Sequence, residues 1–183
     1  MVFSQSEMIK TGRLVGPRLY STGSILYGAD GDFKVVINSL DDALSNLRRL
    51  KAVGAFSVKS YNQPRRDQRQ QILEAARQLK MTVVPEGGST FFTNMNMIAD
   101  GHTGIEHSIP VAPVYKDIIS FWNKTGVAYT PTLIVSYGSQ WGENYWYDRT
   151  NVWENERLMA FTPRSIIDPR ARRRTTSEYG DYG

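Results

Sequence analysis

The stretch "GAFSVKSYNQPRRDQRQQILEAARQLKMTVVPEGG" (residues 54–88) decides the fold. Residues 55–61 and 81–88 are apolar runs of strand length, and each one is closed by polar residues or glycines. The segment between them, residues 64–80, repeats its apolar positions at helical spacing. These positions are Ile72, Leu73, Ala76 and Leu79. A strand, a helix and a second strand in this order predict a β-α-β unit with parallel strands.

The same alternation continues on both sides of this unit. Toward the N-terminus, residues 17–23 predict a strand and residues 39–54 predict a helix, with Ser39 as its N-cap and Gly54 as its terminator. Toward the C-terminus the predicted elements are a helix over 90–101, a strand over 103–109, a helix over 112–126 and a strand over 127–137. We therefore expect an α/β fold of about five parallel strands with intervening helices.

The composition limits the class of protein. A chain of 183 residues with 40% hydrophobic residues is long enough for one domain with its own core. The absence of cysteine excludes disulfides and thiolate metal sites. No run reaches the roughly 18 apolar residues of a membrane span, and the first residues lack the order of a signal peptide. We therefore expect no membrane partner.

The pattern changes after Tyr137. We expect the β/α domain to comprise residues 1–137. Residues 138–163 are expected to form an aromatic-rich loop or helical extension of the same domain, and residues 164–183 a basic tail. Arginines dominate the start of that tail, but no aromatic residues alternate with them and no nucleic-acid-binding module is recognisable. The sequence therefore does not favour a nucleic-acid partner.

Three polar residues stand near the ends of consecutive predicted strands. They are Lys59, Glu86 and His107. Ligands gather at the carboxyl ends of parallel strands, so these side chains are expected at one rim of the sheet. A cation, a carboxylate and an imidazole on one rim suit a metal-centred hydrolytic site, in which the metal acidifies a bound water.

Each of the three residues also has a structural explanation, which the sequence leaves open. Lys59 could be a solvated lysine at a strand end, Glu86 could cap the following helix, and His107 could be a hydrogen-bonded core histidine. Substrate contacts are expected from the aromatic loop, where the candidates are Tyr137, Trp141 and Tyr145.

Five short motifs in this order resemble the amidohydrolase superfamily. They are "GPRLYSTG", "GAFSVKSY", "VVPEGG", "GIEHSIP" and "TPTLIVSYG". The resemblance runs from about residue 2 to about residue 174 and is strongest to imidazolonepropionase-like and prolidase-like members, including secreted bacterial ones joined to a TolB-type β-propeller. It implies a (β/α)8 barrel that hydrolyses amide or ester bonds with one or more divalent metal ions such as zinc.

The resemblance also implies roles for individual residues. In the family, metals are held by a His-X-His pair on the first strand, a lysine on the fourth that can be carboxylated, and histidines on the fifth and sixth. An aspartate on the eighth strand activates water. Lys59 matches the bridging lysine and His107 matches the sixth-strand histidine, whereas Glu86 stands where the fifth-strand histidine is expected. The implied metal ligands are therefore Lys59, Glu86 and His107.

The chain lacks several metal-site residues of the family pattern. It has two histidines, His102 and His107, and no His-X-His pair, and no predicted strand supplies the final aspartate. A complete barrel needs about 250 residues, so we expect a truncated barrel holding the family's third to seventh strands. Two functions follow: a metal-dependent hydrolase of a small-molecule amide or ester, or a non-catalytic, self-assembling fragment of such a barrel.

The expected truncation has two further consequences. Five strands cut from a closed barrel leave free edges and an uncovered inner face, so we expect a homo-oligomer whose interface includes residues 138–158. The family resemblance points to a periplasmic or secreted bacterial parent protein, although the chain itself carries no signal peptide.

Overall fold

The computed structural model describes residues 2–28, 32, 34–61, 63–87, 90–133, 146–147 and 150–172. The chain divides into two compact units, Met1–Thr130 and Pro131–Gly183. The predicted boundary at residue 137 lies outside the described residues.

The first unit is built on parallel strands. Those described are β1 (Ile25–Tyr27), β2 (Lys34–Val35), β3 (Ser57–Tyr61), β4 (Thr82–Pro85), β5 (Gly104–Glu106) and β6 (Ala128–Thr130). The first four form one sheet in the order β2-β1-β3-β4, and the last two form a second sheet. One parallel bridge, between Glu86 and Glu106, joins β4 to β5.

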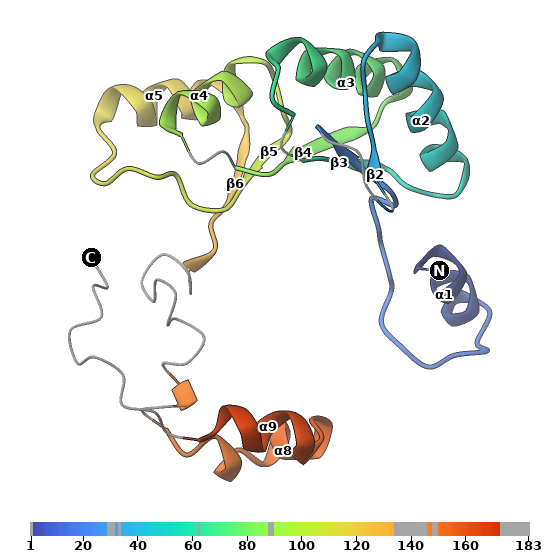
Figure 1. Cartoon of the computed structure of the whole chain (residues 1–183), viewed down its shortest axis with the longest axis vertical. Coiled ribbons are helices and arrows are strands. Elements are labelled where there is room, and N and C mark those ends of the chain that lie inside the picture. Colours follow the sequence, from blue (N-terminus) through green and yellow to red (C-terminus); the bar gives the residue numbers. More distant parts are fainter. Residues whose placement is uncertain are drawn as a thin grey trace. The chain divides into compact units, whose positions relative to one another are not determined.

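Helices alternate with these strands and lie along one face of them (Figure 1). They are α2 (Leu40–Ala52), α3 (Arg66–Leu79), α4 (Phe91–Ala99) and α5 (Lys116–Thr125). Parallel strands with a helix between each consecutive pair from β2 to β6, all on one side, make an α/β fold of the partial TIM-barrel type. The fold predicted from the sequence is confirmed.

The core lies between the strands and the helix layer. Leu26, Val58 and Val83 project from β1, β3 and β4 into a cluster with the apolar faces of α2 and α3. A second cluster joins Ile105 of β5 to α4, and Phe121 and Trp122 of α5 pack against it. Each fully buried side chain of this size contributes about 1.5–3 kcal/mol, so these clusters fix the helices on the sheet.

The predicted helix ends are largely confirmed. Ser39 is the N-cap of α2, where its side chain accepts a hydrogen bond from the backbone N–H of Asp42. Gly54 follows that helix with φ +99°, a conformation that glycine adopts without strain. The helix predicted over residues 64–80 begins later, because Arg65 is the N-cap of α3 and Pro64 precedes it.

The first predicted strand is wrong in position. Residues 17–23 form no strand, and β1 instead begins at Ile25. The reason is burial: Tyr20 is 67% exposed, whereas Leu26 is fully buried in the core. A helix that the sequence analysis did not predict, α1 (Val2–Lys10), precedes this segment, and Phe3 packs against the core cluster.

The second unit contains short helices where it is described. They are η2 (Val152–Glu154), α8 (Glu156–Phe161) and α9 (Arg164–Arg170). Asn155 caps α8 by accepting a hydrogen bond from the backbone N–H of Leu158. α9 occupies the start of the segment predicted to be a basic tail, and its Ile167 is buried. Within the described residues, no helix has the length and apolar character needed to cross a membrane.

His102 is the buried histidine of the first unit, with 1% of its surface exposed. Its Nδ1 lies 2.9 Å from the carbonyl oxygen of Met97, and its Nε2 has no hydrogen-bond partner among the described residues. Burial lowers the pKa of the imidazole, because the charged form would lose its hydration. The folded state therefore holds His102 in its neutral form.

This lowered pKa predicts a loss of stability in mild acid. The unfolded chain binds a proton at His102 near the usual pKa of about 6.5, whereas the folded chain does so only at lower pH. The stabilising contribution is thus complete above about pH 6.5 and declines below it, by at most about 1.4 kcal/mol per pH unit. Urea unfolding at several pH values between about 7.5 and 5.5 measures the slope.

The His102→Asn variant provides the control, because it removes the titrating group and should flatten the pH dependence even if it lowers stability at every pH. A slope that is the same in wild type and variant would contradict this role of His102.

Candidate active site

The parallel register brings the three predicted polar residues to one rim. Lys59 lies opposite Val84 in the β3–β4 pairing. Glu86 directly follows β4, and its backbone N–H donates to the carbonyl of Ser60 at 3.1 Å. His107 directly follows β5, which the Glu86–Glu106 bridge places beside β4. Glu86 and His107 therefore lie at the carboxyl ends of adjacent strands, and Lys59 lies two residues before the end of β3.

The Glu86 carboxylate contacts both of the other side chains. Lys59 Nζ lies 2.7 Å from Glu86 Oε2, and His107 Nε2 lies 2.6 Å from Glu86 Oε1. The side chains of Lys59 and Glu86 are 22% and 21% exposed, and that of His107 is 48% exposed. The site is thus half-buried but open to solvent on the histidine side. Its assignment as a metal site stays a prediction.

The backbone of His107 is part of the arrangement. His107 has φ +70°, a left-handed conformation that costs a residue other than glycine about 1–3 kcal/mol. Its N–H donates to the carbonyl oxygen of Thr130 at 3.0 Å, which holds this turn against β6. In a continued strand, residue 107 would face the helix layer like Ile105, because side chains alternate. The left-handed turn instead directs the imidazole toward Glu86.

Gly87 fixes the approach of β4 to β5. Its N–H donates to the carbonyl oxygen of Glu106 at 2.8 Å. A Cβ atom at this position would lie 2.2 Å from the same oxygen, a distance that no side chain tolerates. Glycine is therefore required here by the close contact between the two backbones.

The structural explanations that the sequence left open do not describe these residues. Thr90, not Glu86, caps the following helix by accepting from the backbone N–H of Thr93. His107 is half-exposed, and the core histidine is His102. Lys59 is not a solvated lysine, because its ammonium group is paired with Glu86.

The donor groups at this rim suit a metal only in part. A carboxylate and an imidazole nitrogen meet at one point, and both are ordinary zinc ligands. Catalytic zinc usually has three protein ligands, yet no group of three histidine, cysteine, aspartate or glutamate residues is found among the described residues. Lys59 would provide the third donor only if carboxylated, since an ammonium group has no free electron pair.

Three residues beside this site were not predicted from the sequence. Tyr27 and Tyr61 are the last residues of β1 and β3, and Lys34, the first residue of β2, lies over the Tyr27 ring. The available signal was the aromatic residue at the end of each apolar run, in "ILY" and "VKSY". The predicted substrate-binding residues Tyr137, Trp141 and Tyr145 lie outside the described residues.

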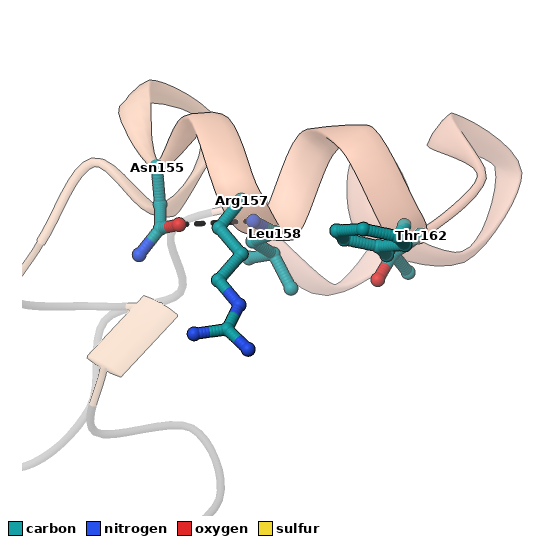
Figure 2. A pocket seen from close by; sticks show the side chains of 5 residues that line it. Asn155, Arg157, Leu158 and Thr162 are labelled. Carbon is teal, nitrogen blue, oxygen red and sulfur yellow. Dashed lines mark hydrogen bonds between the residues drawn. The ribbon is translucent and has the colours of Figure 1, made fainter. Parts of the chain in front are cut away.

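A hollow in the second unit is a weaker candidate. Its walls are the side chains of Asn155, Arg157, Leu158, Phe161 and Thr162, all along α8 (Figure 2). Figure 2 shows that Asn155 is already engaged as the helix cap. The hollow offers one charged group and no second titratable partner, so it supports no chemistry comparable to that of the rim.

Two examples illustrate the likeness of the chain to solved structures. One is an uncharacterized protein, with a TM-score of 0.61 and 18% identity over 74% of this chain. The other is a "putative prolidase from Bifidobacterium longum", with a TM-score of 0.58 and 16% identity over 74% of this chain. The chain spans 40% and 37% of their lengths. No family model and no curated protein sequence matches the chain. These likenesses establish the fold.

The contact at Gly87 predicts a large difference between two glycine substitutions. Gly87→Ala should destabilise the protein by about 1–3 kcal/mol, because the added methyl group overlaps the Glu106 carbonyl oxygen. Gly104→Ala is the matched control on the adjoining strand, since its nearest atom would lie at an ordinary 3.6 Å. Urea unfolding of both variants measures the effect, and equal stabilities would contradict the close contact.

Proposed function

We propose that this chain is part of a hydrolase that cleaves amide or ester bonds, with Lys59, Glu86 and His107 as its reactive groups. The observation that carries the proposal is the Glu86 carboxylate, which lies within 2.7 Å of Lys59 Nζ and 2.6 Å of His107 Nε2. Such a cluster at the carboxyl ends of parallel strands lies where this fold class has its active sites. The likeness to a "putative prolidase" agrees with hydrolysis.

The residues themselves supply proton transfer and charge. The Glu86 carboxylate accepts from either neighbour, and it orients His107 Nε2 at the solvent-facing side of the site. Without a metal ion, Lys59 places a positive charge beside that carboxylate, where it would stabilise an oxyanion developing on a bound carbonyl. His107 is the most exposed of the three groups and is therefore the one that meets substrate first.

The proposal includes one divalent metal ion such as zinc. Glu86 and His107 would hold it, with carboxylated Lys59 as the third donor. Such an ion supplies Lewis acidity and a nucleophilic hydroxide at neutral pH. The ion and the carboxylated lysine both require the Lys59–Glu86 ion pair to be broken.

Metal binding can be tested separately from activity. We expect the purified protein, incubated with zinc and bicarbonate, to bind about one ion per chain by elemental analysis. Loss of a residue that only contacts a metal ligand weakens metal binding by about 10–100-fold. Glu86→Gln and His107→Asn should each weaken zinc binding by more than this, because they remove a ligand itself. Lys59→Arg should do the same, because arginine keeps the charge but cannot take the place of a carboxylated lysine.

Glu106→Gln is the control, since Glu106 adjoins the site and, in the described part of the chain, forms no ion pair with the three side chains. Zinc binding that is equal in all four variants would rule out this metal site. A screen of aryl esters and anilides then tests hydrolysis, and inactivity of the metal-loaded wild type against every class would contradict the proposed function.

A second candidate function, self-assembly, is favoured by the exposed end of the first unit. All three residues of β6 are exposed, and Tyr129 is 42% exposed. No residue of α5 is fully buried: Phe121 packs against the second cluster, whereas Ile119 is 49% exposed. In the described residues β6 has a strand partner on one side only. A second copy of the chain could cover this edge and remove it from solvent.

Self-assembly predicts a homo-oligomer in solution. Trp146 and Trp153 of the predicted interface are 57% and 40% exposed, so they are accessible to a second copy. Light scattering at micromolar concentrations should give a mass at least twice the 20.8 kDa of one chain. Ile119→Asp should shift that mass toward the monomer, because it places a charge on the open side of α5. A stable wild-type monomer would exclude this function.

A further inference from the structure

A row of side chains crosses the sheet beside the candidate active site. Lys34 Nζ lies 3.9 Å from the centre of the Tyr27 ring. The rings of Tyr27 and Tyr61 stack with centres 4.9 Å apart and planes inclined by 16°. Lys59 Nζ lies 5.8 Å from the Tyr61 ring and contacts Glu86. The row thus runs from β2 through β1 and β3 to the reactive carboxylate.

These side chains belong to the face of the sheet opposite the helices. Leu26 and Val58 point into the core with α2 and α3, so the alternating residues Tyr27, Lys59 and Tyr61 project from the other face. The β1–β3 register supports this, since Tyr27 is paired directly with Tyr61. The face is open: Lys34 is exposed, and the two tyrosines are half-buried. A ligand approaching Glu86 from this side therefore meets the row.

The two lysines of the row differ in their electrostatic state. Lys59 is neutralised by Glu86, whereas no described carboxylate forms an ion pair with Lys34. The contact of Lys34 with Tyr27 contributes about 0.5–1 kcal/mol and orients the ammonium group without cancelling its charge. Lys34 therefore presents a positive charge at the far end of a row whose middle consists of aromatic rings.

We propose that Lys34, with Tyr27 and Tyr61, forms a subsite for a carboxylate carried by the substrate at a distance from the bond that is cleaved. This inference rests on the proposed hydrolase function and specifies its substrate class. In the sheet order β2-β1-β3-β4, β2 and β4 are three strand spacings apart. Since one spacing is about 4.8 Å and Lys34 leans toward β1, the subsite lies about 10–14 Å from Glu86.

That distance selects substrates by length. The aromatic rings of Tyr27 and Tyr61, together with Val84, give the space between the two charged ends an apolar wall. A chain of methylene groups fits such a wall, and a terminal carboxylate would then reach the ammonium group of Lys34. The substrate class is therefore an amide or ester of a long dicarboxylic acid whose second carboxylate is free.

The experiment compares monoaryl esters of dicarboxylic acids, from succinate to dodecanedioate, with the same esters whose free carboxylate is methylated. For the long acids we expect kcat/KM of the free acid to exceed that of the methylated ester by about three- to tenfold, the range for one charged hydrogen bond at a partly exposed site. Lys34→Met should bring the ratio of kcat/KM for the free acids to kcat/KM for the methylated esters close to one. Lys124→Met, which removes a lysine of α5, is the control and should leave this ratio unchanged.

A binding experiment tests the subsite independently of the proposed hydrolase function. If no ester is hydrolysed, the hydrolase proposal fails, but a titration of sebacate followed by NMR of the tyrosine rings still tests the subsite. Weaker binding of sebacate by Lys34→Met than by wild type would support the subsite in either case. Equal binding by the two proteins, or an equal preference for the free acids, would overturn it.

Discussion

The backbone contact between β4 and β5 is the constraint on which the candidate site depends. Gly87 donates to the carbonyl oxygen of Glu106, and the absence of a Cβ atom allows the two strands to meet at that point. This contact and the neighbouring bridge join the two sheets into one series of parallel strands. Because Glu86 and His107 lie on either side of the junction, the same contact brings the carboxylate and the imidazole within bonding distance.

The two faces of the sheet carry different kinds of side chain. The face toward α2, α3, α4 and α5 carries the apolar residues, so the burial that stabilises the unit is completed on that side. The opposite face carries lysines, tyrosines and glutamates, none of which is fully buried, so a ligand can reach them. Because successive side chains of a strand point to opposite faces, the residues that stabilise the core and the residues of the candidate site lie on different faces. His107 departs from this alternation through its left-handed backbone.

The incomplete barrel accounts for both functions proposed for this chain. A closed barrel would surround the polar face and supply the remaining groups of an active site. In the described residues the β6 edge is exposed, so the proposed metal binding and the proposed self-assembly both depend on what completes this rim. A second copy of the chain would pair the exposed backbone of the strand edge, and a ligand would neutralise charge at the open rim.

The sequence by itself determined the order of most strands and helices, the Ser39 cap and the three strand-end residues, because hydrophobic period and capping chemistry are local. It placed the first strand at 17–23, since an apolar run cannot reveal that Leu26 is the residue that reaches the core. It missed α1 and α9, whose apolar residues are few. Only the tertiary structure decided that Glu86 lies between Lys59 and His107, and that Lys34 lies over Tyr27. These contacts join residues from different strands, so strand register and the φ angle of His107 set them, and neither is encoded in a local pattern.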